Sequence, residues 1–303
     1  MENLMIVRLG IIGFSEGNGH PYSWSAIFNG YEPEYMKDCD FPIIAEYLAE
    51  RKWPDDQIQS GRVTYIWTQD SRLSDRIARA SKIDNIASTP EDMIGKVDAI
   101  LLARDDAQNH AKFAAPFLDA GLPVYLDKPM ALSMRDLTTL QSLCKFDGQI
   151  FSCSALRYAN ELQLSEKQRY EIGELQRIVG RTPKSWDKYA VHVIEPGLQM
   201  LDPADQPIRH ERRYSNKDAV RLTSHWESGV ETVFESLGSE SKEGISLEVE
   251  GSNGKVILKF HDSFSAFRSA LLAFMRQIED PQTDNNFGLV YRSVSLIEKG
   301  RSQ

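Results

Sequence analysis

The sequence predicts an α/β protein, with a doubly wound parallel sheet in residues 1–150 and an α+β domain with a large, mostly antiparallel sheet in residues 151–303. In the first half, short apolar runs alternate with stretches of helical periodicity, which is the pattern of parallel strands joined by helices. In the second half, strand-like runs follow one another with only turn residues between them, which favours antiparallel neighbours. At 303 residues the chain is long enough for about two domains.

Five apolar runs in the first half are the predicted strands of the parallel sheet, and polar or helical stretches separate them. They cover residues 7–13, 63–68, 99–103, 124–126 and 150–155. The last run marks the expected domain boundary near residue 150. A helix-sized stretch at residues 134–143 precedes it. This alternation predicts a sheet covered by helices on both faces.

The strand at 124–126 runs directly into Asp127-Lys128-Pro129. An amphipathic helix is predicted before it, with apolar residues between 113 and 118 at helical spacing and Gly121 at its end. In open parallel sheets, ligands bind outside the carboxyl ends of the strands. Lys128 is therefore a candidate functional residue, and the alternative is a surface lysine that merely closes a strand.

A glycine-rich turn follows the first strand and contains Gly13, Ser15, Gly17 and Gly19. A dinucleotide-binding fold has Gly-x-Gly-x-x-Gly at this place, because the backbone must approach the pyrophosphate at a helix N-terminus. Here Ser15 stands where the second glycine is expected, and the loop is longer than usual. The turn predicts phosphate binding, and the alternative is a glycine loop that only turns the chain.

The second half contains five successive strand-like runs, at residues 175–179, 220–226, 230–236, 245–250 and 255–260. Gly229 and Ser252-Asn253-Gly254 are turn signals between them. Residues 203–207 are expected to form only a short polar loop. Apolar residues from Phe264 to Ile278 fall on one helical face, which predicts a C-terminal helix docked on a core.

The segment around Lys128 resembles the Gfo/Idh/MocA oxidoreductases, the family of glucose–fructose oxidoreductase and inositol dehydrogenase. The family pattern is a histidine, a helix that ends in Ala-Gly, a short strand and Glu-Lys-Pro. His110, Ala120-Gly121 and Asp127-Lys128-Pro129 match it without a gap, with aspartate in place of glutamate. Arg157-Tyr158 and Ile172-Gly173-Glu174-Leu175 extend the match into the second half. The resemblance implies a Rossmann domain that binds NAD or NADP, and an open-sheet domain through which members often form homodimers or homotetramers.

The resemblance also implies roles for individual residues. Lys128 would hydrogen-bond the reacting substrate hydroxyl, and His192 would take its proton. Family enzymes often carry Asp-x-x-x-His at the second position, whereas here Lys188 replaces the aspartate and Asp187 lies one residue earlier. The predicted substrate-binding residues are Arg157, Tyr158, Lys188 and Tyr189.

The other cofactor-binding candidates lie at strand ends. NAD-binding Rossmann folds carry an acid after the second strand for the ribose hydroxyls. That position falls on Thr68, with Asp70 and Arg72 beyond it, so the ribose diol of NAD and the 2′-phosphate of NADP each have a candidate partner, and the choice stays open. The full set of predicted cofactor-binding residues is Gly13, Ser15, Gly17, Gly19, Thr68, Asp70, Arg72, Asp105, His110 and Asp127.

Composition argues against several other functions. The net charge of −9 disfavours a nucleic-acid partner, which needs a basic surface. The three cysteines have unrelated spacings and indicate neither a disulfide framework nor a metal site, so no metal is expected. No apolar run approaches the ~20 residues that span a bilayer, and no signal peptide is recognisable. We therefore expect a cytoplasmic protein without a membrane partner.

Together these observations predict an NAD(P)-dependent oxidoreductase acting on CH–OH groups. The expected reaction is hydride transfer between nicotinamide and a hydroxyl-bearing carbon of a sugar, cyclitol or sugar derivative. Two alternatives stay open: a nicotinamide-dependent enzyme without net redox change, such as an epimerase or lyase, and a non-catalytic ligand sensor on the same fold. Ser15, Asp105 and Lys188 depart from the family pattern and favour these alternatives. The substrate does not follow from the fold.

Overall fold

The computed structural model describes residues 6–216, 218–283 and 287–301. These residues form two compact units. The first unit comprises the described residues of Met1–Asp127, Thr138–Ser152 and Phe267–Asn285, and the second comprises those of Lys128–Leu137, Cys153–Ala266 and Asn286–Gln303. The division differs from a single cut near residue 150, because a late helix packs on the strands of the first unit and the segment after Asp127 packs with the second.

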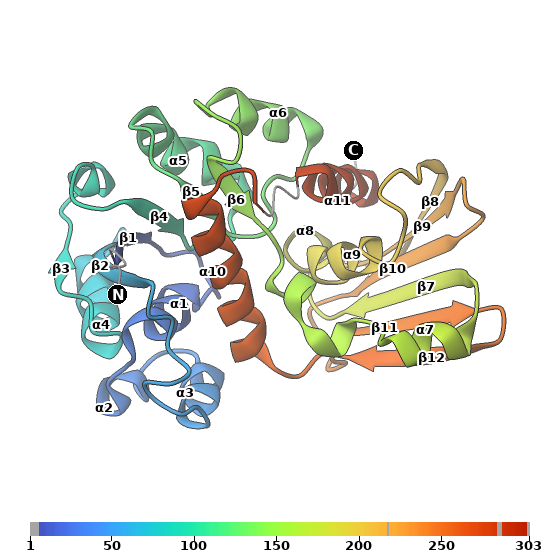
Figure 1. Ribbon diagram of the computed structural model, residues 1–303, viewed down its shortest axis with the longest axis horizontal. Helices are drawn as coiled ribbons and strands as arrows, with labels where there is room; N and C mark the ends of the chain where they lie inside the picture. The colour runs from blue at the N-terminus through green and yellow to red at the C-terminus, as the bar shows by residue number, and fades with distance from the viewer. Residues whose placement is uncertain (1–5, 217, 284–286, 302–303) are drawn as a thin grey trace. The chain divides into compact units, whose positions relative to one another are not determined.

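The first unit is built on a parallel sheet of six strands in the order β3-β2-β1-β4-β5-β6 (Figure 1). The strands are β1 (Val7–Ile12), β2 (Gly61–Trp67), β3 (Asn85–Ile86), β4 (Ala99–Leu102), β5 (Val124–Leu126) and β6 (Ile150–Ser152). The strand order reverses between β1 and β4, which is the switch point where such sheets bind ligands. The predicted doubly wound sheet is confirmed.

Helices connect these strands, as the alternating pattern predicted. They are α1 (His20–Asn29), α2 (Pro33–Met36), α3 (Pro42–Ala49), α4 (Ser71–Ala80), α5 (His110–Asp119), most of α6 (Met134–Ser142) and most of α10 (Ser263–Glu279), with 3₁₀ turns η1 (Pro90–Met93) and η2 (Ala107–Asn109). All four residues of β4 are buried, because a parallel strand is covered on both faces. The ring of Phe274 in α10 lies 5.5 Å from that of Tyr125 in β5, so the predicted docking of this helix on a core is confirmed.

The second unit is built on a mixed sheet in the order β12-β11-β7-β10-β9-β8. Its strands are β7 (Leu175–Thr182), β8 (Pro207–Asn216), β9 (Ala219–Trp226), β10 (Glu231–Leu237), β11 (Ser246–Gly251) and β12 (Gly254–Lys259). Among the described strands of this second sheet, only β7 and β10 pair in parallel, and the other pairs are antiparallel. The predicted large, mostly antiparallel sheet is confirmed.

Helices cover one face of this second sheet, and Figure 1 shows α8, α9 and α11 on the same side of it. The helices are α7 (Glu166–Ile172), α8 (Trp186–Tyr189), α9 (Val191–Leu198) and α11 (Phe287–Gly300), with 3₁₀ turns η3 (Ala155–Tyr158) and η4 (Asn160–Leu162). Gly180 in β7 lets α9 approach closely, because a Cβ there would lie 2.7 Å from the Cβ of Val193. This contact fixes the helix that carries His192.

The sequence did not predict β8 and α11. Residues 203–207 were expected to form only a loop, yet β8 begins at Pro207. β8 is an edge strand whose sequence, PIRHERRYSN, is dominated by polar residues, so it lacks the apolar pattern of a half-buried strand. Among the described residues, no helix is both long and apolar enough to cross a membrane.

Candidate functional site

The turn between β1 and α1 contains the glycines that were predicted to bind phosphate. A Cβ at Gly13 would lie 2.7 Å from Cγ of Pro21, and one at Gly19 would lie 2.5 Å from Cδ1 of Ile44. Packing within the chain therefore requires glycine at these two positions. Gly17 differs, because it has a φ of +77° and its Cβ would meet no atom within 4 Å. The space beside Gly17 suits an anionic group, although the His20 N–H at the start of α1 already donates to Oδ1 of Asn18 at 2.8 Å.

Polar side chains join this turn to the loop after β4. The Ser15 hydroxyl donates to Oδ1 of Asp105 (2.7 Å) and accepts from the Asp105 N–H (3.0 Å), and both residues are buried. Arg104 donates twice to the Asp106 carboxylate, at 2.9 and 2.7 Å, and once to the Phe14 carbonyl at 2.8 Å. Two of the departures from the family pattern, Ser15 and Asp105, are thus hydrogen-bonded to each other.

The residues after β2 form a helix cap. The Thr68 hydroxyl donates to the Asp70 carbonyl at 2.6 Å. Asp70 is the N-cap of α4, and its carboxylate accepts from the backbone N–H of Arg72 at 2.9 Å. Arg72 is exposed. Both the carboxylate of Asp70 and the guanidinium of Arg72 therefore remain candidates for the ribose end of a dinucleotide, and their geometry does not choose between NAD and NADP.

His110 and Asp127 are both fully enclosed. Nε2 of His110, at the start of α5, lies 2.7 Å from the Arg104 carbonyl, which ties the helix to the loop after β4. Oδ2 of Asp127 accepts from Nδ2 of Asn18 (2.7 Å) and lies 2.6 Å from Nδ1 of His20. Sequence analysis did not assign a role to His20, although its place directly after Gly19 is the signal that could have pointed to it.

In the second unit, Lys128 and His192 meet at one aromatic ring. The Lys128 ammonium lies 5.4 Å from the centre of the Tyr189 ring, and the His192 ring lies edge-on to Tyr189 at 5.2 Å. Lys128 and His192 are both largely buried. Lys128 follows β5 and His192 lies in α9, so the fold brings together two candidates that are 64 positions apart in the sequence. A cation, a proton acceptor and a phenol gathered in this way suit acid–base chemistry.

Sequence analysis missed Ser154, which contacts His192, and Glu195, which contacts Ser154. Oγ of Ser154 lies 2.8 Å from Nδ1 of His192, and the Ser154 N–H donates to Oε2 of Glu195 at 2.7 Å. Glu195 lies three residues after His192 in α9, and Nε of Arg157 donates to the same oxygen at 3.0 Å. The signal for Glu195 was an acid on a helix that is otherwise entirely buried.

Arg157 and Glu195 form a buried ion pair, with side chains 1% and 4% exposed. Burial raises the pKa of Glu195, while Arg157 and the Ser154 N–H oppose this by stabilising the carboxylate. Burial alone would lower the pKa of Arg157, but the Glu195 carboxylate more than offsets it and the pKa is raised. Nη2 of Arg157 lies 3.0 Å from Oε2 of Glu195, which is the geometry of an ion pair. The guanidinium of Arg157 is bound to Glu195. A contact between Arg157 and the substrate stays a prediction.

The remaining substrate-binding candidates surround the same helices. Asp187, which lies one residue before the position of the family aspartate, forms an ion pair with Arg301, with Oδ1 of Asp187 3.2 Å from Nε of Arg301. Lys188 is half-buried beside it. Tyr158 ends η3, the turn that also carries Arg157. The contacts of Lys188 and Tyr158 with substrate stay predictions.

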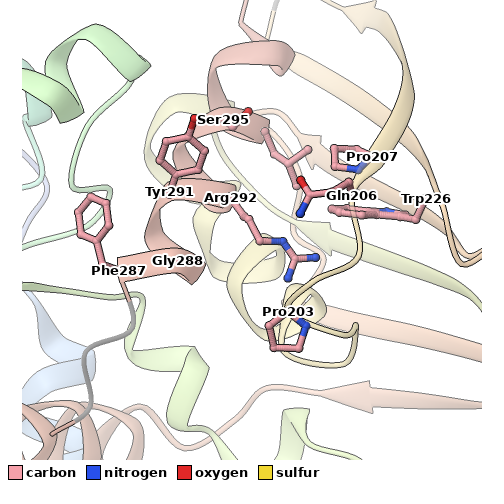
Figure 2. Close-up of a pocket in the computed structure, with 10 residues that line it drawn as sticks. Pro203, Gln206, Pro207, Trp226, Phe287, Gly288, Tyr291, Arg292 and Ser295 are labelled. Carbon is pink, nitrogen blue, oxygen red and sulfur yellow. The ribbon is translucent and has the colours of Figure 1, made fainter. Parts of the chain in front are cut away.

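A separate cavity of about 380 Å³ lies in the second unit beside α11, and none of the predicted site residues lines it (Figure 2). Its walls are largely aromatic and proline side chains with one guanidinium, which lies 5.0 Å from the centre of the Trp226 ring. The lining residues are Pro203, Gln206, Pro207, Trp226, Phe287, Gly288, Tyr291, Arg292, Ser295 and Leu296.

Comparison with known proteins identifies the first unit. Residues 43–154 match a family described as an oxidoreductase family with an NAD-binding Rossmann fold. The myo-inositol dehydrogenase of Corynebacterium glutamicum superposes with a TM-score of 0.71 at 13% identity, over 97% of this chain and 95% of that one. The apo scyllo-inositol dehydrogenase of Lactobacillus casei gives 0.69 at 12% identity, over 97% and 96%.

A third solved structure, the UDP-N-acetylglucosamine 3-dehydrogenase of Acidithiobacillus ferrooxidans, gives a TM-score of 0.68 at 9% identity, over 98% of this chain and 97% of that one. At such identities these likenesses show the fold alone. No curated protein matches the chain by sequence.

Fold and match together define an NAD-binding Rossmann unit followed by a second unit with a large mixed sheet. Residues 43–154, which include His110 and Lys128, match the model of the Gfo/Idh/MocA oxidoreductase family, so the resemblance seen in the sequence is confirmed over this segment. Because that family is NAD-binding, the predicted cofactor class, NAD or NADP, is confirmed at the level of the family.

Proposed function

We propose that the protein is an NAD(P)-dependent oxidoreductase that transfers a hydride between nicotinamide and a hydroxyl-bearing carbon of a sugar, cyclitol or sugar derivative. The observation that carries this proposal is the meeting of Lys128 and His192 at the Tyr189 ring. It is supported by the oxidoreductase family match and by the dehydrogenases among the similar structures. A cytoplasmic location and a homodimer or homotetramer are part of the same proposal.

The first unit has features that fit a dinucleotide. The space beside Gly17 would receive the pyrophosphate, since the dipole of α1 favours an anion near its N-terminus. Asp70 or Arg72 would contact the ribose end, with Thr68 fixing the turn that carries them. Ser15 and Asp105 would border the dinucleotide through the bridge they form, and His110 and Asp127 would support the loops around it.

In the direction of oxidation, a bound nicotinamide dinucleotide would supply the hydride acceptor for the carbon that bears the hydroxyl. Lys128 would donate to the reacting oxygen and stabilise its developing negative charge. His192 would take the hydroxyl proton on Nε2, in the tautomer whose Nδ1–H donates to Ser154 Oγ. The substrate would leave as a carbonyl compound, and the protonated imidazole of His192 would pass its proton to solvent.

The pH dependence of His192→Asn tests this assignment. The oxidation rate of the wild type should rise with pH through one ionisation, because only the neutral imidazole accepts a proton. His192→Asn should flatten this profile and slow turnover, while NADH and NADPH still bind as judged by fluorescence titration. An unchanged profile in the variant would reduce His192 to a structural residue.

A cofactor-release assay separates this proposal from its alternatives. Purified protein is denatured and the released dinucleotide is measured. Dinucleotide that exchanges freely supports a dehydrogenase. Tightly retained dinucleotide supports a reaction without net redox change, because the cofactor must then be regenerated within each turnover. No retained dinucleotide, together with no binding of either reduced form below millimolar, would remove the oxidoreductase proposal and favour the sensor.

A further inference from the structure

Lys184, between β7 and α8, has an unusual backbone. Its φ of 64° lies in the left-handed region, which L side chains other than Asn and Asp rarely adopt. A β-bridge holds it there: the Lys184 N–H donates to the Gly238 carbonyl (2.9 Å), and the Gly238 N–H donates back (3.2 Å). A non-glycine residue stays in this region only where the surrounding structure holds it there. Such residues cluster at ligand sites.

This backbone places the Lys184 ammonium at the ring that Lys128 and His192 share. Nζ of Lys184 lies 4.5 Å from the centre of the Tyr189 ring and donates to its hydroxyl oxygen at 2.5 Å. Lys184 itself is exposed. Tyr189 thus has one ammonium at its hydroxyl and a second, that of Lys128, 5.4 Å from its centre.

Lys184 and Tyr189 present hydrogen-bond donors without an acceptor. An ammonium has three N–H donors, and only one of them is used on Tyr189. The Tyr189 oxygen accepts that bond, so its own O–H must point elsewhere, and no described residue accepts it. The nearest acid along the chain, Asp187, is occupied by Arg301 at 3.2 Å. Two adjacent donors, one of them charged, are complementary to an oxyanion.

Lys82 provides a comparison within the same chain. It is the other described non-glycine residue with a positive φ, at 53°. Its ammonium lies 3.0 Å from the Glu32 carboxylate, so the chain itself supplies the anion. No described carboxylate forms an ion pair with Lys184. The two lysines share a backbone conformation and differ in whether the anion comes from the protein.

We propose that Lys184 and Tyr189 bind an oxyanion of the substrate, so that the substrate is an acidic carbohydrate, either a sugar acid or a sugar phosphate. The inference rests on the proposed function, because it assigns the substrate class of the same site. It adds Lys184 to that site and gives Tyr189 a role beyond lining it, because its hydroxyl donates to the anion.

Binding of D-glucuronate and glucose 6-phosphate to the full chain tests the inference directly, with glucose as the neutral counterpart and calorimetry as the measurement. At least one acid should bind more tightly than glucose. Lys184→Gln should weaken that binding by about 10- to 100-fold, the scale of one charge-assisted hydrogen bond. Tyr189→Phe, which keeps the ring, should weaken it several-fold. Lys82→Gln is the matched control for the charge and the backbone.

The two acids distinguish the sources of the oxyanion, because only glucuronate offers a carboxylate and only glucose 6-phosphate offers a phosphate. Circular dichroism and thermal unfolding verify that each variant is folded. The inference is overturned if neither acid binds the wild type, or if folded Lys184→Gln and Tyr189→Phe both bind the acids as tightly as the wild type does.

Turnover separates this inference from the proposed function. For the oxidation of the acid that binds, Lys184→Gln should lower the ratio of its kcat/KM to that of glucose by about tenfold or more. Lys184-dependent binding without any hydride transfer would support the anion site and remove the oxidoreductase. Oxidation of glucose or myo-inositol without binding of either acid would do the reverse.

Discussion

Two polar clusters, one in each unit, differ in what their positive charges contact: a carboxylate in the first cluster and an aromatic ring in the second. In the loop cluster, made of Ser15, Arg104, Asp105 and Asp106, the Arg104 guanidinium is held by both oxygens of the Asp106 carboxylate. In the ring cluster, made of Lys128, Lys184, Tyr189 and His192, two ammoniums face one phenol ring. A charge compensated within the chain stabilises a loop, whereas a charge that faces a ring and a hydroxyl can still attract a ligand. We therefore propose that the first cluster shapes its site and that the second takes part in recognition and chemistry.

The sharpest test of this difference is Lys128→Ala. We expect turnover to fall about 100- to 10,000-fold, because the charge at the reacting oxygen is lost. Dinucleotide affinity should change less than threefold. Lys96→Ala is the matched control, since its ammonium lies 5.3 Å from the centre of the Tyr65 ring in the first unit. Turnover of Lys128→Ala within threefold of the wild type would remove Lys128 from the mechanism.

His192 of the ring cluster contacts Ser154, and the Ser154 N–H donates to Glu195 of the buried Arg157–Glu195 ion pair. We therefore expect Glu195→Gln to lower the stability of the fold. The substitution leaves Arg157 buried without a carboxylate, which costs about 3–5 kcal/mol of unfolding free energy. Glu231→Gln is the control, because its pair with Arg177 (2.7 Å) is partly exposed and should contribute less than about 1 kcal/mol. Urea unfolding measures both. Equal small losses would show that burial does not matter here.

Much of the fold was predictable because apolar patterns carry it. The run at 99–102 is buried along its whole length, and such runs have few alternatives to a parallel strand. β8 was not predicted, because an edge strand can carry charged residues at most positions and then lacks the apolar pattern that marks a strand. Helix α11 was not predicted, because its amphipathic pattern follows that of the longer helix α10 and was not recognised as a second helix.

The candidate site was predictable only where a motif marks it. Lys128 and His192 were found through a fixed family spacing. Ser154, Lys184 and Glu195 have no such signature, because their roles arise from tertiary contacts: Ser154 meets His192 across 38 positions. The left-handed backbone of Lys184 could not be predicted, because glycine and asparagine, and not lysine, are the residues typical of that conformation. Packing, and not local sequence, brings these residues into the site.

Asp106→Asn should weaken the loop cluster by about 1–3 kcal/mol, since Arg104 loses its charged partner. Burial tends to raise the pKa of Asp106, but hydrogen bonds from Arg104 and Asn109 outweigh it and the pKa lies below the ordinary value of 3.8. The stabilisation is therefore complete well above pH 3.8 and is lost as the pH falls below it. Thermal unfolding should show the wild type losing its advantage over the variant in that acid range. A difference that does not depend on pH would contradict this.

The smallest expected effect concerns the cavity beside α11, where a charge has neither a carboxylate nor full hydration. The Arg292 guanidinium lies 5.0 Å from the Trp226 ring centre and donates only one hydrogen bond, at 3.3 Å, to the Asp202 carbonyl. Its Nε and Nη2 are buried without a partner among the described residues, and burial lowers its pKa. The cation–π attraction of about 1–2 kcal/mol is thus offset by a desolvation cost of similar size.

Arg292→Met keeps the apolar stem and removes both terms. We expect the free energy of unfolding to stay within about 1 kcal/mol of the wild type, on the stabilising side, because two buried nitrogens without partners, Nε and Nη2, disappear. Arg212→Met is the control, since its guanidinium lies 4.9 Å from the exposed Tyr214 ring, where desolvation is weak. Urea unfolding of both variants decides the sign. A loss above about 1 kcal/mol at Arg292 would mean that attraction to the Trp226 ring dominates, and that this guanidinium belongs with compensated charges such as Arg104.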